Sequence, residues 1–151
     1  MTSGMPKSAR GWSVHEVLQM WGTTHNTVFA ALEDSLGRDR VERLIVGQMR
    51  QAGRDAAETH LPDATEIGQA ILAIEEPWGI EGRVVEATPN QFTREVSKCP
   101  WSYFRPLACQ VFAWWMKGFV EGSNGQCQYS LDKMIPEGAD ACVWRVTRDA
   151  P

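Results

Sequence analysis

The chain has 151 residues, of which 43% are hydrophobic and 23% charged, and its formal net charge is −4. These values are close to the averages for folded globular domains and exclude the disordered and fibrous classes. Lys and Arg are scattered among acidic residues, which argues against binding of nucleic acid or of an anionic membrane surface. No run approaches the roughly 18 apolar residues of a membrane span, and residues 1–10 lack the apolar stretch of a secretory signal, so we expect a cytoplasmic protein.

The first structured element is predicted to begin at Ser13, after a mobile tail over residues 1–12. Ser13 and Glu16 match a capping box, in which each side chain bonds to the backbone of the other residue, and a short helix should follow. A second helix is expected over residues 26–36. Gly37 then supplies the left-handed residue that commonly closes a helix.

The clearest helical pattern spans residues 40–59, with Asp39 as the expected N-cap. Its apolar residues recur at helical spacing and form one stripe: Val41, Leu44, Ile45, Met49, Ala52 and Ala56. Pro62 prevents easy continuation. A further helix is predicted from Asp63 or Thr65 to Pro77.

After Pro77 the pattern changes from helical stripes to short strands. Segments 82–88 and 91–98 flank a Pro-Asn turn and predict a hairpin, and a helix follows over residues 106–120. Two more strands are expected over 126–135 and 141–147. The order predicts a single α+β domain over residues 13–151, in which N-terminal helices precede a hairpin, a helix and a second hairpin. The hairpins would form one antiparallel sheet covered by helices.

Tryptophan is the unusual residue of this composition. The chain has seven, at positions 12, 21, 78, 101, 114, 115 and 144, which is several times the ordinary number for this length. Large flat side chains commonly line cavities for organic ligands, although they also fill cores. We therefore expect an aromatic pocket for a small organic molecule. Its candidate substrate-binding residues are Cys142, Trp101, Trp114, Trp115, Trp144, Tyr129 and Glu86.

Cysteine is the most informative candidate for chemistry. Cys99, Cys109, Cys127 and Cys142 all lie in the last third of the chain, without the closely paired spacing of a zinc ribbon, and would be free thiols in a reducing compartment. Because Pro100 favours the first position of a helical turn, Cys99 is predicted at a helix cap, where backbone N–H groups favour the thiolate. A helix packed on the terminal sheet would bring Cys109 and Cys142 together. The alternative for each is a small buried hydrophobic residue.

His60 is the third candidate catalytic residue, with Cys99 and Cys109. It continues the apolar stripe four residues beyond Ala56, so it should face the core or a pocket and act there as a base. The alternative is a structural histidine that closes the C-terminus of its helix.

A family resemblance rests on Leu36-Gly37, Ile45, Met49, Cys99-Pro100, Cys109 and the run from Gly138 to Trp144. Over about residues 30 to 148 the chain resembles the L-2-amino-thiazoline-4-carboxylic acid hydrolase family. The resemblance implies attack on the amidine-like carbon of a cyclic C=N substrate. Cys99 or Cys109 would attack directly, or His60 would activate water.

The C-terminal part is also similar to the four-vinyl-reductase-type ligand-binding domain, in which some members hold zinc through a Cys, a Glu-x-x-Cys and a later Cys. Here Cys109 and Cys142 occupy the outer positions, while Leu131 and Met134 stand at the inner two. Since these two side chains are poor zinc ligands, we predict no tight zinc site and no other cofactor.

Three functions remain open from the sequence. The first is a hydrolase-like enzyme that opens a cyclic amidine or thiazoline. The second is a cyclase-like biosynthetic enzyme, or a small-molecule-binding sensor domain with an aromatic pocket. The third is a structural subunit, which requires an exposed apolar patch. A small organic molecule is the expected partner in the first two, and a homodimer is the commonest oligomer.

Overall fold

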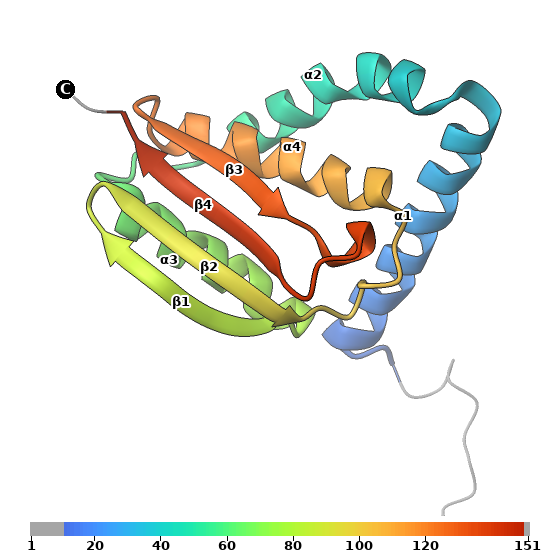
Figure 1. Ribbon diagram of the computed structural model, residues 1–151, viewed down its shortest axis with the longest axis horizontal. Helices are drawn as coiled ribbons and strands as arrows, with labels where there is room; N and C mark the ends of the chain where they lie inside the picture. The colour runs from blue at the N-terminus through green and yellow to red at the C-terminus, as the bar shows by residue number, and fades with distance from the viewer. Residues whose placement is uncertain (1–10, 150–151) are drawn as a thin grey trace, which may run out of the picture.

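The computed structural model describes residues 11–149, and within that range it contains four α-helices and one four-stranded antiparallel sheet (Figure 1). The α+β class predicted from the sequence is confirmed. The sheet has the strand order β1-β2-β4-β3. The two strands of each predicted hairpin pair with each other, and the pairing of β2 with β4 joins the two hairpins. Most of the expected N-terminal tail lies outside the described residues.

The N-terminal region is one long helix, α1 (Val14–Leu36), and the expectation of two shorter helices is wrong. The predicted capping box is present, with Ser13 as N-cap and Glu16 as its partner. The helix continues because no Gly-Pro or Asn-Gly signal interrupts it. The hydroxyl groups of Thr23 and Thr24 instead bond to the carbonyl oxygens one turn earlier, at 3.1 and 3.0 Å.

A sharp turn at Gly37, whose φ is 78°, connects α1 to α2 (Arg38–Ala56). Gly37 is itself the N-cap of α2, so the prediction that Asp39 caps this helix is wrong, and Asp39 lies in the first turn. The helix also ends earlier than predicted, at Ala56. The helix ends in a tight turn, in which the backbone N–H of Ala57 donates to the carbonyl oxygen of Arg54.

The remaining elements follow the predicted order closely. Asp63 caps α3, as expected, with its Oδ1 accepting from the backbone N–H of Glu66 at 3.0 Å. The bounds of these elements are α3 Ala64–Glu75, η2 Glu76–Trp78, β1 Glu81–Thr88, β2 Gln91–Lys98, α4 Pro106–Ser123, β3 Cys127–Lys133, η3 Ile135–Glu137 and β4 Cys142–Arg148.

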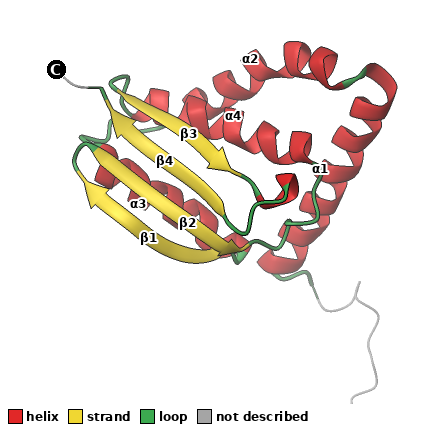
Figure 2. Ribbon diagram, viewed as in Figure 1, coloured by secondary structure: helices red, strands yellow, loops and turns green. Residues whose placement is uncertain are grey.

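The molecule has three layers: the sheet, then α3 and α4, then the pair α1 and α2 (Figure 2). The main core lies between the first two layers. Its largest members are Phe92, Trp144 and Val146 on the sheet, Ile67 and Ile71 on α3, and Val120 on α4. The predicted alternation of the last strand is confirmed, since Trp144 and Val146 are buried and Arg145 is exposed. No helix in residues 11–149 is long and apolar enough to cross a membrane.

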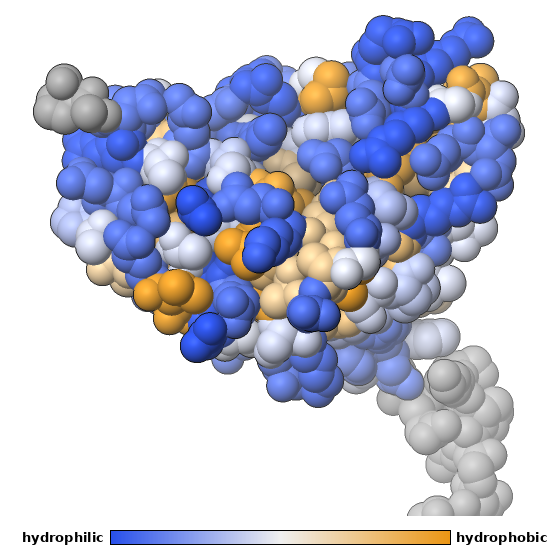
Figure 3. Space-filling model, in the orientation of Figure 1, coloured by the Kyte–Doolittle hydropathy of each residue, from blue (hydrophilic) through white to orange (hydrophobic). Residues whose placement is uncertain are grey.

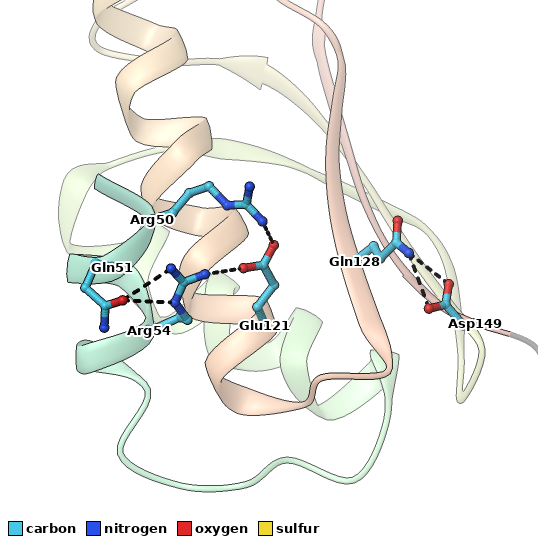
Figure 4. Close-up of polar contacts among 6 residues, drawn as sticks. All are labelled: Arg50, Gln51, Arg54, Glu121, Gln128 and Asp149. Atoms are coloured by element: carbon cyan, nitrogen blue, oxygen red, sulfur yellow. Dashed lines mark hydrogen bonds and ion pairs between the residues drawn. The ribbon is translucent and has the colours of Figure 1, made fainter. Parts of the chain in front are cut away.

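Glycines allow α2 and α4 to approach at backbone distance. A side chain at Gly118 of α4 would overlap the carbonyl oxygen of Arg50, and Gly53 of α2 has the same relation to Trp115. Figure 4 shows that the two helices are also joined by charge, since Arg50 and Arg54 both bond to Glu121. The same view shows Gln128 of β3 donating to Asp149 at 3.0 Å. Because these ion pairs are partly exposed, the close contact between the two helices contributes more to the stability of the fold than the charges do.

We predict that Gly118→Ala destabilises the fold by about 1–3 kcal/mol, because the added methyl group meets rigid backbone and forces the two helices apart. Thermal or urea unfolding measures the change. Gly47→Ala is the matched control. Gly47 also lies inside a helix, but nothing is within 4 Å of an added Cβ, so that substitution should be neutral or stabilising by about 0.5–1 kcal/mol. Equal melting temperatures for the two variants would contradict a close backbone contact between α2 and α4 at Gly118.

Candidate functional site

Three of the four thiols converge at one end of the sheet. Cys99 follows β2, Cys142 begins β4, and Cys109 lies in the first turn of α4. Val96 and Cys142 are register partners on adjacent strands, so the start of β4 lies beside the end of β2. The thiols of Cys99 and Cys142 both act electrostatically on Cys109. Cys127 is buried at the opposite end of the sheet and does not join them.

Burial keeps these thiols protonated. It raises the pKa of Cys109 to about 12, with smaller contributions from the neighbouring Cys99 and Cys142. Burial also raises the pKa of Cys99, although the backbone N–H of Trp101 bonds to its sulfur and opposes the shift. The prediction that the position of Cys99 favours the thiolate is therefore wrong. The segment after Cys99 forms tight turns, and the helix begins only at Pro106.

Four other predicted site residues do not lie with the thiols. His60 is exposed in the loop after α2, near the C-terminal end of α4, because α2 ends before it and the apolar stripe does not continue. Glu86 is exposed on the edge strand β1 and accepts from Gln91 at 2.6 Å. Trp114 packs against α2 in a separate core cluster, and Trp115 stacks on Phe119.

A buried carboxylate beside the thiols was missed by the sequence analysis. Glu75, at the end of α3, is 7% exposed and accepts from the indole Nε1 of Trp144 at 2.7 Å. Its other oxygen lies 3.4 Å from Nε of Arg94. Burial raises the pKa of Glu75, while Trp144 and Arg94 hold it down. The sequence does contain a signal for the burial of Glu75, because this residue continues the helical spacing of the buried Ile67 and Ile71.

The carboxylate links the thiols to the rest of the interior. Glu75 acts electrostatically on Cys99, Cys142 and Tyr129, which places all of these groups in one region. The ring of Tyr129 packs 6.0 Å from that of Trp144, and burial raises the pKa of its hydroxyl. The backbone N–H of Ile135 donates to the sulfur of Cys142 at 3.3 Å. The charged groups that act on this region are the Glu75–Arg94 pair, Asp132 beside Tyr129 and Glu137 beside Cys109.

A surface groove of about 500 Å³ lies on the outer side of Arg94. Helix α3 forms one wall, and the start of β1 with the loop before it forms the other. Its lining residues are Gln69, Leu72, Ala73, Glu76, Gly79, Ile80, Glu81 and Arg94. Arg94 connects the groove with the buried polar network, since it lines the groove and also pairs with Glu75. The volume is within the range of small-molecule sites, roughly 300–1,000 Å³.

An aromatic cluster adjoins the thiols on the helical side. Trp101, Phe104 and Ala108 are buried there, and Cys99 and Cys109 pack against them. His25 of α1, to which the sequence analysis gave no role, lies among these rings. Its Nε2 is 2.9 Å from the carbonyl oxygen of Ala108, and burial lowers its pKa while this hydrogen bond opposes the shift. The sequence contains a signal for this position, because Trp21, His25 and Phe29 are spaced four residues apart and therefore lie on one face of the helix.

Figure 3 shows that apolar residues gather on the viewed face between the sheet and the helices, while hydrophilic residues cover most of the rest of that face. Of the positions considered for zinc, Met134 is buried and Leu131 packs against the core. No group of three His, Cys, Asp or Glu within residues 11–149 is arranged to hold a metal ion. The absence of tight zinc binding stays a prediction.

No protein-family model matches the sequence, and no curated protein matches it. Solved structures show similar folds. A trafficking protein particle complex subunit 3 from Naegleria fowleri, covalently bound to palmitic acid, has a TM-score of 0.59 at 12% identity, over 88% of this chain and 95% of that chain. The phenol-responsive sensory domain of the transcription activator PoxR, with phenol, has a TM-score of 0.56 at 15% identity, over 87% and 74%. Identities this low show the fold alone.

We predict that Cys109 reacts slowly with iodoacetamide in the folded protein. At pH 8 a thiol of pKa about 12 is ionised roughly a thousandfold less than one of pKa 9. Its alkylation rate, followed by mass spectrometry of peptides, should rise about tenfold per pH unit from pH 7 to 10 without levelling off. The urea-unfolded chain is the control, in which the rate should level off near pH 9. A plateau below pH 8 in the folded protein would contradict a raised pKa.

Proposed function

We propose that this chain is a small-molecule-binding domain of the sensor type, which binds an organic ligand in the groove between α3 and the β1–β2 hairpin. The observation that carries the proposal is the position of Arg94, which lines the groove and also belongs to the buried network of Glu75 and Trp144. A ligand in the groove therefore contacts the residues that hold α3 on the sheet. Such a contact converts ligand binding into a change in packing, as a sensor requires.

The similar folds support this proposal. The sensory domain of PoxR is described with phenol, and the Naegleria fowleri protein with palmitic acid, so two proteins of this fold hold small organic molecules. In this chain, Leu72, Ala73 and Ile80 give the groove apolar contact area.

Hydrolysis of a cyclic C=N substrate, which the resemblance implies, is less well supported. A sulfur nucleophile must be a thiolate near neutral pH, whereas burial raises the pKa of Cys109 to about 12 and also raises that of Cys99. The proposed base, His60, lies on the surface beyond the other end of α4. Neutral thiols are poor nucleophiles, and the residues that line the groove include no cysteine.

We predict that Ala73→Trp weakens ligand binding at least tenfold by filling the groove. Ala73 is exposed, so the larger side chain should not disturb the core. The probes are phenol, benzoate and hexanoate, and binding is measured by the rise in melting temperature and by titration calorimetry. Ala52→Trp, at an exposed position of α2, is the control and should bind like the wild type. No saturable binding of any probe, or equal binding by both variants, would contradict the proposal.

A second candidate function, a subunit that associates through α1, is favoured by the exposed face of that helix. Residues 17–32 contain no Asp, Glu, Lys or Arg. Five large apolar side chains of α1 are between 43% and 68% exposed: Val14, Val17, Met20, Trp21 and Val28. The Naegleria fowleri protein of similar fold is likewise a subunit of a complex.

The occupant that we propose for this face is a second copy of the chain. An uncharged stretch pairs with itself without like-charge repulsion, whichever way the two helices run. The five side chains expose on the order of 500 Å² per copy, taking roughly 150–250 Å² for each large side chain. Two copies thus bury about 1,000 Å², the lower limit for a specific interface.

We predict that Val17→Glu converts a dimer into a monomer, because a charge buried between two apolar helices finds no partner. Light scattering coupled to size exclusion measures the mass. Val85→Glu, which places the same charge at an exposed valine of β1, should remain dimeric. A wild-type protein that is monomeric at all concentrations would exclude the second copy.

A further inference from the structure

The hydrogen bonding of Arg94 is incomplete. Its side chain is only 11% exposed, and its Nε is 3.4 Å from Glu75. A guanidinium carries five N–H donors, and four of them are on the two Nη atoms. Among the described residues, none accepts a hydrogen bond from either Nη atom of Arg94. These atoms are also not sealed in the protein interior, where an unpartnered polar atom would be isolated from solvent.

We infer that these donors face the groove. Arg94 lines it, whereas Glu75, the residue that occupies its Nε side, does not. An acceptor on a ligand in the groove can take these donors in place of water. A carboxylate is the acceptor that fits best, because its two oxygens match the fork of a guanidinium.

The other lining residues define the rest of the ligand. Leu72, Ala73 and Ile80 offer an apolar surface beside Arg94. Of the two acids at the rim, Glu81 is paired with Lys98 at 2.6 Å, and Glu76 is exposed, so water screens its charge. The groove volume of about 500 Å³ suits a molecule with one ring or a short chain.

We propose that the groove binds small organic carboxylates, with the carboxylate on the Nη atoms of Arg94 and the apolar body against Leu72 and Ile80. This inference rests on the proposed function and names the chemical class of its ligand. The carboxylate completes the hydrogen bonding of Arg94, and the apolar body supplies the remaining binding energy.

Matched pairs of probes test the proposal, since each pair keeps the same apolar body and replaces the charged carboxylate with a neutral amide of similar shape. Benzoate is compared with benzamide, and hexanoate with hexanamide, by titration calorimetry on the full chain. We expect each carboxylate to bind at least tenfold more tightly than its amide, with the difference decreasing as salt is added. Ala73→Trp should weaken the binding of the carboxylates at least tenfold.

Variants assign the preference to one cation. Arg94→Gln combined with Glu75→Gln removes both charges of the buried pair together, and the ratio of affinities should fall to about one. Lys98→Gln removes the other cation near the groove and should leave the ratio unchanged. If the double variant does not fold, Arg94→Lys serves instead, and it should reduce the preference because the ammonium lacks the two-pronged geometry.

The outcomes separate this inference from the proposed function. Equal binding of carboxylate and amide in the groove would overturn the carboxylate class and leave a small-molecule-binding domain. A preference for carboxylate over amide that persists in the Arg94 variants, or that disappears with Lys98→Gln, would place the anion away from Arg94. Either result would also overturn the carboxylate proposal. If no probe binds, including phenol, both proposals fail.

Discussion

The fold depends on one buried polar contact, the bonds that Glu75 makes to Trp144 and Arg94. These two donors are register partners on the adjacent strands β4 and β2, so a single carboxylate on α3 fixes the pairing of the two central strands and the position of the helix across them. A slip of one residue in either strand would turn its donor to the outer face of the sheet. Removing one partner of such a pair typically costs about 3–5 kcal/mol, because the other charge stays buried alone.

The same contact connects the groove with the interior, because Arg94 belongs to both. Glu75 uses both oxygens inside the protein, whereas Arg94 has donors left and lies where the groove reaches the core. The interior beyond Glu75 contains Tyr129 and the converging thiols, and burial keeps those thiols protonated. The Glu75–Arg94 pair is therefore the buried ion pair between the groove and the thiols.

Local patterns predicted most of the fold. The hairpin turns, the cap at Asp63 and the alternation around Trp144 depend on neighbouring residues, so the sequence contains their signal. The site was predicted less well. Cys99, Cys109 and Cys142 were expected to converge, but the pKa of a thiol depends on burial by residues distant in sequence. His60 was misplaced because α2 ends one turn earlier than its apolar spacing suggests. Glu75 was missed because an acid is normally assigned to the surface, even when its helical position is buried.

The thiols and the carboxylate illustrate how burial selects a function. An enzyme nucleophile needs its charged form, and cysteine is used where a helix N-terminus or a cation lowers its pKa. Here Cys109 lies in the first turn of α4, yet desolvation raises its pKa to about 12. Desolvation by the surrounding residues is thus the dominant influence on this thiol, in spite of its place near a helix N-terminus. Because burial opposes the thiolate, these sulfurs are poorly suited to nucleophilic attack, and Arg94 is the cation among the described residues that line the groove.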